Sequence, residues 1–264
     1  MMFSPEQKIW IGHPHPASSR LITRPGKDPK RSCMCGRYSL ICIDDLGNRF
    51  RVFDPMMGSR SRFNITPGNE MPVIVRAGEN HAPTMRWGLI PSWTKDIRAA
   101  KPLINARAET LGEKPAFRSL LNARRCLVPA SGFFEWKKEG NRKRPVYFRL
   151  TDDPLFSFAG LFDQWHNPEG VTVSTYTIIT CNANSLVAPL HDRMPVILSR
   201  ATEERWLSSD PVTSEELKQI LVPCPAVLME AVPVSDLVNN TAVDDERVIQ
   251  PLTSHTGTQT HLPV

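Results

Sequence analysis

Short apolar runs broken by turn residues constrain the fold more than any other feature of this 264-residue sequence. Eight runs are rich in β-branched or aromatic residues and are bounded by Gly, Pro, Asn or Asp, which is typical of strands separated by turns. They cover residues 37–43, 71–77, 124–130, 145–150, 156–165, 174–181, 194–199 and 226–234. The polar segment 137–145 predicts a turn between two strands, and therefore a hairpin.

Helical patterns are few. Residues 110–124 place apolar side chains at helical spacing, residues 201–210 follow Ser199 as N-cap, and residues 214–221 begin with Ser214 as N-cap before two glutamates. The 24 prolines suit turns and strand edges better than long helices. Many strands with few helices predict an α+β domain built round a strongly bent sheet or barrel-like core, with a few flanking helices.

The sequence predicts one domain with a tail at each end. Residues 1–34 mix Pro, Ser, Gly and basic residues without a period of 2 or 3.6, so we expect no fold there. Residues 252–264 are polar and Thr-rich, which favours a loose tail. No linker after residue 35 is long enough to separate two domains, so we expect a single domain over 35–251.

The net charge of +5 and the pI of about 9.0 first suggest nucleic-acid binding. Residues 1–34, however, hold six basic and two acidic residues, whereas the rest of the chain has 26 basic against 25 acidic. Because the domain itself is nearly neutral, bulk charge cannot hold a polyanion there. Any contact with nucleic acid must come from a few local residues.

Cysteine usage and hydropathy exclude several classes. Six cysteines without a CxxC pair favour a reducing cytosol over a disulfide scaffold or a zinc site. His13 and His15 have no third ligand nearby, so we expect them to be solvated and expect neither metal nor cofactor. The sequence has no apolar run of about 18 residues and no secretory leader. These features predict a cytoplasmic monomer that does not contact membranes.

Cys35 is the first candidate for chemistry. It follows Met34 and precedes a glycine, and an initiator methionine is normally removed before a small residue. A chain that began at Cys35 would carry an α-amine with a pKa near 8 beside a thiol. Such a pair condenses with aldehydes, because the thiol can close a five-membered ring onto the imine. The alternative is that Cys35 is an internal, small apolar residue.

Three further segments concentrate polar residues. Asn64 precedes a Pro-Gly turn, where an asparagine usually shapes the backbone. His191 lies in an HDR cluster between apolar residues, where a carboxylate can orient an imidazole for acid–base work. The third segment holds Trp87 and Trp93 at a Gly-Pro turn, followed by alternating Asn105, Arg107 and Glu109. Aromatic rings beside an arginine suit an unpaired nucleic-acid strand, although core packing is the commoner role of such tryptophans.

Taken together, these blocks resemble the SRAP family, the SOS-response-associated peptidases that shield abasic sites in single-stranded DNA. The resemblance rests on MCGRYSL, RFNITPG, RWGLIPSW, INARAET, SGFFEW and TCNANSLVAPLHDRMPVIL, which occur in the family order between Cys35 and about Val234. It implies a single α+β domain with a barrel-like core and a positively lined cleft. It also implies a covalent thiazolidine between an N-terminal cysteine and the ring-opened sugar of an abasic site.

The resemblance implies roles for particular residues. Cys35 would be the nucleophile and Asn64 would lie beside its amine, and Glu109 and His191 are the other two residues that carry over. Our hypothesis is that Glu109 accepts the ammonium proton and assists loss of water, and that His191 donates a proton to the sugar ring oxygen. Strand contacts are expected from Arg37, Arg62, Arg107, Trp87 and Trp93. The expected partner is single-stranded DNA with an abasic site, and the protein would associate with the nucleoid when bound.

One feature departs from the family, whose members begin at the cysteine. Residues 1–34 precede it here, so Met34 is the true start, or the extension is removed, or no thiazolidine forms. Misassignment of the start is favoured, and self-cleavage is the next explanation, since the family name records a peptidase activity. Two other functions remain open: a cysteine peptidase acting in trans through Cys35 or Cys181, and a non-covalent module that binds single-stranded DNA.

Overall fold

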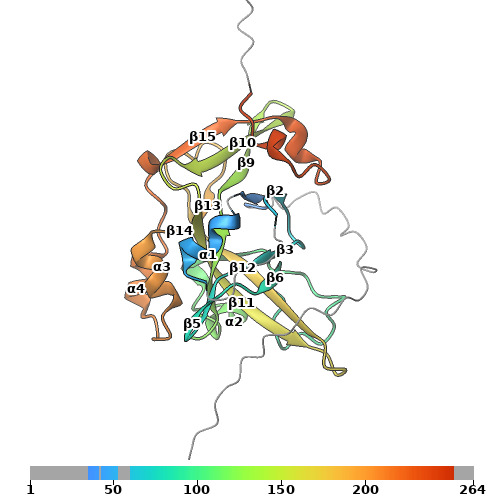
Figure 1. Cartoon of the computed structure of the whole chain (residues 1–264), viewed down its shortest axis with the longest axis vertical. Coiled ribbons are helices and arrows are strands. Elements are labelled where there is room, and N and C mark those ends of the chain that lie inside the picture. The colour runs from blue at the N-terminus through green and yellow to red at the C-terminus, as the bar shows by residue number, and fades with distance from the viewer. Residues whose placement is uncertain (1–34, 42, 53–59, 253–264) are drawn as a thin grey trace, which may run out of the picture.

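A computed structural model describes residues 35–41, 43–52 and 60–252 of the chain, and β-strands dominate it (Figure 1). The strands are β1 (Tyr38–Leu40), β2 (Arg62–Ile65), β3 (Glu70–Pro72), β4 (Val75–Ala77), β5 (Glu79–His81), β6 (Thr84–Trp87), β7 (Asn105–Arg107), β8 (Arg125–Ala130), β9 (Gly132–Glu139), β10 (Arg142–Leu150), β11 (Phe156–His166), β12 (Thr172–Asn182), β13 (Arg193–Pro195), β14 (Ile197–Leu198) and β15 (Met229–Pro233). The helices are α1 (Leu46–Phe50), α2 (Pro115–Arg118), α3 (Arg200–Leu207) and α4 (Ser214–Ile220). Single 3-10 turns are η1 (Ile43–Asp45), η2 (Ala108–Thr110), η3 (Ala226–Leu228), η4 (Asp236–Asn239) and η5 (Glu246–Val248).

Two large sheets hold most of these strands. The first has the order β15-β10-β9-β1-β2, and its strands pair antiparallel. The second has the order β14-β11-β12-β6-β3, with β7 and β13 paired to β12 and β8 paired to β11. β4 and β5 form a separate ribbon. The predicted α+β class is therefore confirmed.

Aromatic side chains join the two sheets into one core. Phe133 of the first sheet packs on Phe158 of the second, with ring centroids 6.2 Å apart. The hydroxyls of Tyr38 and Tyr176 share a 2.7 Å hydrogen bond across the same interface. A smaller cluster lies on the other face of β9 and β10, where Phe134 packs on Tyr147. Because side chains alternate along β9, Phe133 and Phe134 face different clusters.

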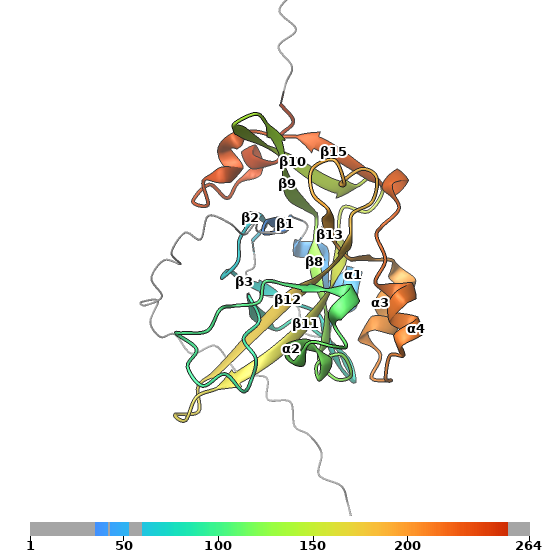
Figure 2. The same cartoon turned by 180° about the vertical axis from the view of Figure 1, so that it is seen from behind.

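Helices lie mainly on one flank, where Figure 2 shows α3 and α4 beside the second sheet. Ser199 caps α3, as predicted, by accepting a hydrogen bond from the Thr202 backbone. The N-cap of α4 is Thr213 rather than the predicted Ser214, and Thr213 forms a capping box with Glu216. No helix in the described residues is long and apolar enough to span a membrane.

Several predicted boundaries were wrong. The helix predicted over 110–124 is reduced to the short α2, because Pro115 can begin a helix but cannot continue one. The strand predicted over 71–77 is divided into β3 and β4 by Val73 and Ile74, which bond to other segments. The hairpin at 137–145 is present, but its strands extend to a loop of only Gly140 and Asn141. Gly140 has φ +58°, a positive value that two-residue hairpin turns require. The polar residues of 137–145 therefore belong to exposed strand ends and not to a long loop.

The predicted tails mostly lie outside the described residues. Residues 1–34 fall wholly outside them, together with His13 and His15. Of the segment 252–264, only Leu252 is described, and its backbone N–H donates to the carbonyl of Pro233.

Candidate active site around Cys35

Cys35 lies just before β1, with its side chain 3% exposed. β1 pairs with β9, and the Phe134 N–H donates to the Arg37 carbonyl, so the residues before Tyr38 run alongside β9. This pairing places the Cys35 backbone nitrogen 2.9 Å from a carboxylate oxygen of Glu135, to which it donates. The Cys35 thiol donates over 3.7 Å to the carbonyl of Arg193. Two distant parts of the chain therefore meet at this cysteine.

Glu135 is a buried carboxylate, 4% exposed, and the sequence analysis assigned it no role. Burial raises its pKa, whereas hydrogen bonding from Cys35 and the charge of His191 oppose the rise. A raised pKa makes a carboxyl group a better proton acceptor, which favours a role in proton transfer. The signal that could have identified it lies in SGFFEW, where a single acid stands in an apolar and aromatic run.

The thiol of Cys35 is held in its protonated form. Burial raises its pKa well above the ordinary value, and the neighbouring carboxylate of Glu135 and the thiol of Cys181 raise it further, against the opposing charge of Arg193. Burial similarly raises the pKa of Cys181 to about 12. Neither thiol is therefore a ready thiolate at neutral pH, which disfavours a peptidase that depends on a preformed thiolate.

Arg193 connects three of the candidate residues. Its guanidinium forms two 2.8 Å hydrogen bonds to the Glu109 carboxylate and further bonds to Asn182 and the Thr180 carbonyl. Its backbone N–H donates over 3.0 Å to Nδ1 of His191, and its carbonyl accepts from the Cys35 thiol. The hydrogen bonds from Arg193 lower the pKa of Glu109, so this carboxylate is ionised and committed to the arginine.

His191 is part of the same cluster. Its Nδ1 also lies 3.0 Å from a carboxylate oxygen of Asp192, which is largely exposed. In the neutral ring, a hydrogen bond from the Arg193 N–H to Nδ1 leaves the ring proton on Nε2. The neutral ring can then donate a hydrogen bond through Nε2, and the protonated ring can donate a proton from the same atom. The effect of His191 on the pKa of Glu135 indicates that the two groups are close.

Asn64 makes a different set of contacts from those expected. Its side chain is 1% exposed, and its amide nitrogen donates to the carbonyls of Val238, Asn240 and Val243. Its amide oxygen accepts from Arg37. Thus Glu135, rather than Asn64, provides the hydrogen-bond partner that the structure gives to the Cys35 nitrogen, and Asn64 ties β2 to the segment after β15.

The residues expected to contact DNA fall into two groups. Trp87 is 1% exposed, stacks near Tyr176 and donates through Nε1 to the Ile104 carbonyl, so its ring is part of the core and cannot receive a base. Arg62 is held by Asp244, and Arg37 by Asn64. Trp93, in contrast, is 55% exposed, and Arg107 is exposed at the end of β7.

No group of three or more His, Cys, Asp or Glu side chains among the described residues could hold a metal ion. The four cysteines described as free, at 35, 126, 181 and 224, are all buried.

Comparison with known proteins identifies the family. The family model described as SOS response associated peptidase (SRAP) matches residues 34–241. The abasic site processing protein YoqW of Bacillus subtilis (strain 168) is 40% identical over 222 residues, covering 82% of this chain and 99% of that protein. The abasic site processing protein HMCES of Xenopus tropicalis is 32% identical over 253 residues, covering 78% of this chain and 75% of that protein. The chain belongs to the SRAP family.

Solved structures show the same fold. A crystal structure of a protein from Bacteroides thetaiotaomicron superposes with a TM-score of 0.74 at 30% identity, covering 82% of this chain and 99% of that chain. A protein from Bordetella bronchiseptica gives a TM-score of 0.66 at 26% identity, covering 76% of this chain and 100% of that chain.

Proposed function

We propose that this protein processes abasic sites in single-stranded DNA by forming a thiazolidine through Cys35. The observation that carries the proposal is the 2.9 Å contact between the Cys35 nitrogen and the buried Glu135 carboxylate, with the thiol of the same residue three bonds from that nitrogen. An amine and a thiol at one residue, beside a group that exchanges protons, are the requirements of condensation with an aldehyde. The names of the relatives YoqW and HMCES support the substrate class.

The reaction balances without a cofactor. The α-amine of Cys35 adds to C1′ of the open-chain sugar, and the resulting carbinolamine loses water to give an imine. The thiol sulfur then adds to the same carbon, and the thiol proton moves to the imine nitrogen, which becomes the ring N–H. We assign transfer of the ammonium proton and assistance to water loss to Glu135, because it is the carboxylate nearest the nitrogen. His191 donates a proton to the sugar ring oxygen as the ring opens.

Glu109 has a supporting role in this scheme. Its pKa is lowered by Arg193, so it is a poor proton donor, and its two hydrogen bonds hold the arginine whose backbone contacts His191 and Cys35. Glu109 therefore positions the cluster and does not exchange protons itself. A Glu109→Gln variant should keep most of the crosslinking rate, whereas Glu135→Gln should lose most of it. The opposite order would return the proton-transfer role to Glu109.

The chemistry requires a chain that begins at Cys35. Translation from Met34 followed by methionine removal would supply it. Self-cleavage would also do so: the Cys35 thiol attacks the carbonyl of residue 34, a thioester forms as the C–N bond breaks, the thiol proton passes to the departing amine, and water hydrolyses the thioester. The positive φ of Cys35, +40°, supports the second route, since a left-handed conformation strains a non-glycine residue by roughly 1–3 kcal/mol. Mass spectrometry of the purified 264-residue chain should show loss of residues 1–34 in the wild type but not in Cys35→Ala.

One experiment separates the three candidate functions. Protein that begins at Cys35 is incubated with single-stranded DNA carrying one abasic site, and the products are separated on a denaturing gel. The thiazolidine proposal expects an adduct that is absent with Cys35→Ala and with protein that retains a residue before Cys35. A non-covalent binding module would give no adduct with any variant. A peptidase acting in trans would cleave a protein substrate whether or not residues precede Cys35.

Trp93 and Arg107 are the proposed strand contacts. The loop that carries Trp93 is fixed on β11 by a hydrogen bond from the Ser92 N–H to Asp163 and by one from Trp165 to the Thr94 carbonyl. A fixed, exposed ring is suited to stacking with an unpaired base. Replacing Trp93 with Ala should therefore weaken binding of single-stranded DNA, and replacing it with Phe should restore most of the affinity. Equal affinities for the two variants would exclude stacking.

A further inference from the structure

The hairpin formed by β9 and β10 concentrates the positive charge of the domain. Residues 137–144 hold five basic residues and one acidic residue, a net charge of +4. The rest of the chain after residue 34 has 21 basic and 24 acidic residues, a net charge of −3. A small region with a charge opposite to that of its own domain produces a strong local field.

Cross-strand pairing within this hairpin is electrostatically unfavourable. Lys143 lies directly opposite Lys138, and Arg144 directly opposite Lys137. Like charges in opposed positions destabilise an antiparallel pair. Glu139 relieves one of these pairs, because its carboxylate lies 3.1 Å from both Lys137 and Arg144. No ion pair of the described residues relieves Lys138 and Lys143. A sheet that keeps two opposed lysines at its exposed end is suited to a partner that brings negative charge.

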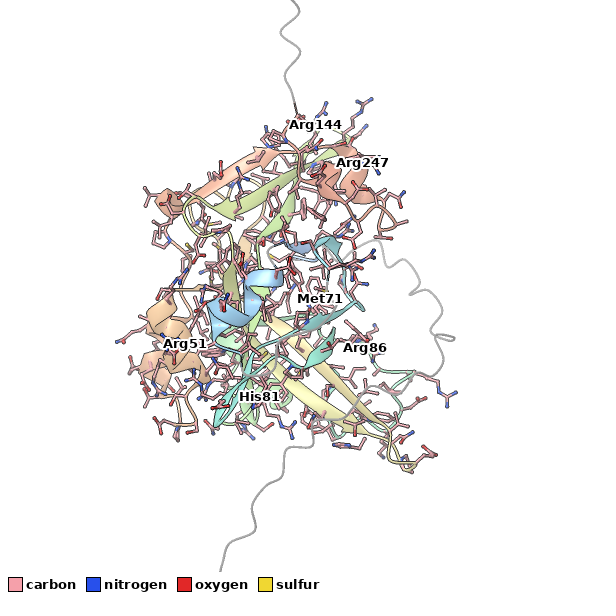
Figure 3. The ribbon with its side chains drawn as sticks, in the orientation of Figure 1. Arg51, Met71, His81, Arg86, Arg144 and Arg247 are labelled. Atoms are coloured by element: carbon pink, nitrogen blue, oxygen red, sulfur yellow. The ribbon has the colours of Figure 1, made fainter. Side chains whose placement is uncertain are left out.

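The hairpin also continues directly from the candidate active site. Side chains alternate along a strand, so Glu135 and Lys137 lie on the same face of β9, and Arg144 lies opposite Lys137 on that face. Two residues of strand span roughly 7 Å. Figure 3 places Arg144 at the end of the molecule that this hairpin forms. Cations on this face therefore begin about one residue pair beyond Glu135, and the pair Lys138 and Lys143 adds two more on the opposite face of the same hairpin end.

We propose that the β9–β10 hairpin, residues 137–144, binds the phosphate backbone of the DNA strand that continues beyond the abasic nucleotide. This inference rests on the proposed function, since it takes Cys35 and Glu135 as the point where the strand is held. The hairpin has no exposed aromatic ring among residues 137–144, so it provides charge without stacking. Its contribution should depend on strand length and salt and not on base sequence.

Variants at the opposed pair Lys138 and Lys143 test the proposal. The double variant Lys138→Glu/Lys143→Glu keeps like charges opposed at this pair, so the pair is as unfavourable as before, but the net charge of residues 137–144 falls from +4 to zero. The single variant Lys138→Glu creates an attractive cross-strand pair and should raise the melting temperature. Both variants should weaken binding of single-stranded DNA. If the lysines had only a structural role, the single variant, which stabilises the hairpin, would not weaken it. The control is Arg200→Gln/Lys218→Gln, which removes two exposed charges on the α3–α4 flank.

The measurement is non-covalent affinity for intact single-stranded DNA of two lengths, across a range of salt concentrations. Wild type and control should bind a long strand more tightly than a short one. A further variant, Lys138→Gln/Lys143→Gln, removes two positive charges and should make the dependence of log affinity on log salt shallower by about 1.4. The charge variants should lose the length advantage and bind the short strand as the wild type does. Equal affinity of wild type and charge variants for the long strand would overturn the proposal. A second outcome would also overturn it. If the charge variants bound DNA as the wild type does but no longer bound a polyglutamate probe, the partner of the hairpin would be an acidic protein segment.

Because this assay uses DNA without an abasic site, it does not depend on the crosslink. If wild-type protein formed no adduct but showed the length and salt dependence, the thiazolidine proposal would fail and the hairpin proposal would survive. If adducts formed on short and long strands at the same rate in wild type and charge variants alike, the hairpin would be irrelevant to DNA and the thiazolidine proposal would survive.

Discussion

Two buried polar clusters lie close together on the first sheet, and burial affects them differently. In the cluster around β9, Cys35 and Glu135 contact each other, and burial raises the pKa of both. In the cluster around β2, Asn64 donates to three backbone carbonyls, and one oxygen of Asp244 accepts the backbone N–H groups of Phe63 and Asn64. β1 separates the two strands in the sheet.

The difference between these clusters distinguishes a structural from a chemical role. In the Asn64 cluster, the side-chain amide donates to backbone carbonyls and the Asp244 carboxylate accepts from backbone N–H groups and pairs with Arg62, so these groups have partners in the folded protein and stabilise it. In the Cys35 cluster, a thiol and a carboxyl group share a buried site, and burial disfavours the ionised form of each. Groups kept in this condition are costly for folding and are typical of active sites. The comparison predicts that variants in the first cluster alter stability and variants in the second alter the reaction.

The largest expected effect belongs to Glu135→Gln. The amide keeps the size of the side chain and a possible contact with the Cys35 nitrogen but cannot accept a proton. The rate of adduct formation should fall by roughly 10²–10⁴-fold, the usual contribution of a positioned acid or base. Single-turnover kinetics with protein beginning at Cys35 measure this rate. A loss of less than about threefold would remove Glu135 from the reaction and break the comparison.

Asn64→Ala should have the next largest effect, on stability. The substitution removes the Asn64 donor from the carbonyls of Val238, Asn240 and Val243 and the acceptor from Arg37. Val238 keeps a bond from Arg37 and Asn240 one from the Val243 N–H, so we expect a loss of about 2–4 kcal/mol in unfolding free energy. Urea denaturation measures it, and Asn239→Ala, which removes one exposed hydrogen bond to Trp136, is the matched control at less than about 1 kcal/mol. The folded fraction should still form adducts at nearly the wild-type rate. A stable but inactive Asn64→Ala protein would place Asn64 in the reaction after all.

The sequence allowed prediction of the strands and of which motifs gather at Cys35, but not of the partner each polar residue has. Alternation and turn residues depend on neighbours in the chain, so β8, β11 and β12 were predicted within two residues at either end. The partner of the Cys35 nitrogen lies 100 positions away on β9 and follows from strand pairing, which no local pattern specifies. For the same reason, the sequence could not show that Trp87 packs against Tyr38 and Tyr176 in the core, where it cannot stack with a base.

The smallest expected effect is on the pH dependence of stability, and it tests the environment of Glu135 alone. The folded pKa of Glu135 is raised above its unfolded value of about 4.3, so the folded state binds more protons in this range and stability falls as pH rises through the folded pKa. The other carboxyl groups with shifted pKa values, at Glu109, Glu139, Glu216 and Asp245, are all lowered, so their effects lie at more acidic pH. The shifted cysteines act at alkaline pH, because burial raises their pKa values.

Among the shifted groups, Glu135 alone therefore acts between the ordinary carboxyl pKa and the alkaline range. In the 264-residue chain carrying Cys35→Ala, which keeps residues 1–34 and therefore an amide nitrogen at position 35, adding Glu135→Gln should increase stability relative to Glu135 as pH rises across this range. In protein beginning at Cys35, an ammonium group would stand beside the carboxylate and favour its ionised form, so the gain should shrink or reverse. Melting temperatures of both proteins at pH 5 and pH 8 measure the difference. If Glu135→Gln showed the same pH dependence with and without residues 1–34, the amine would not lie beside Glu135, and the two clusters would not differ in the way the contacts indicate.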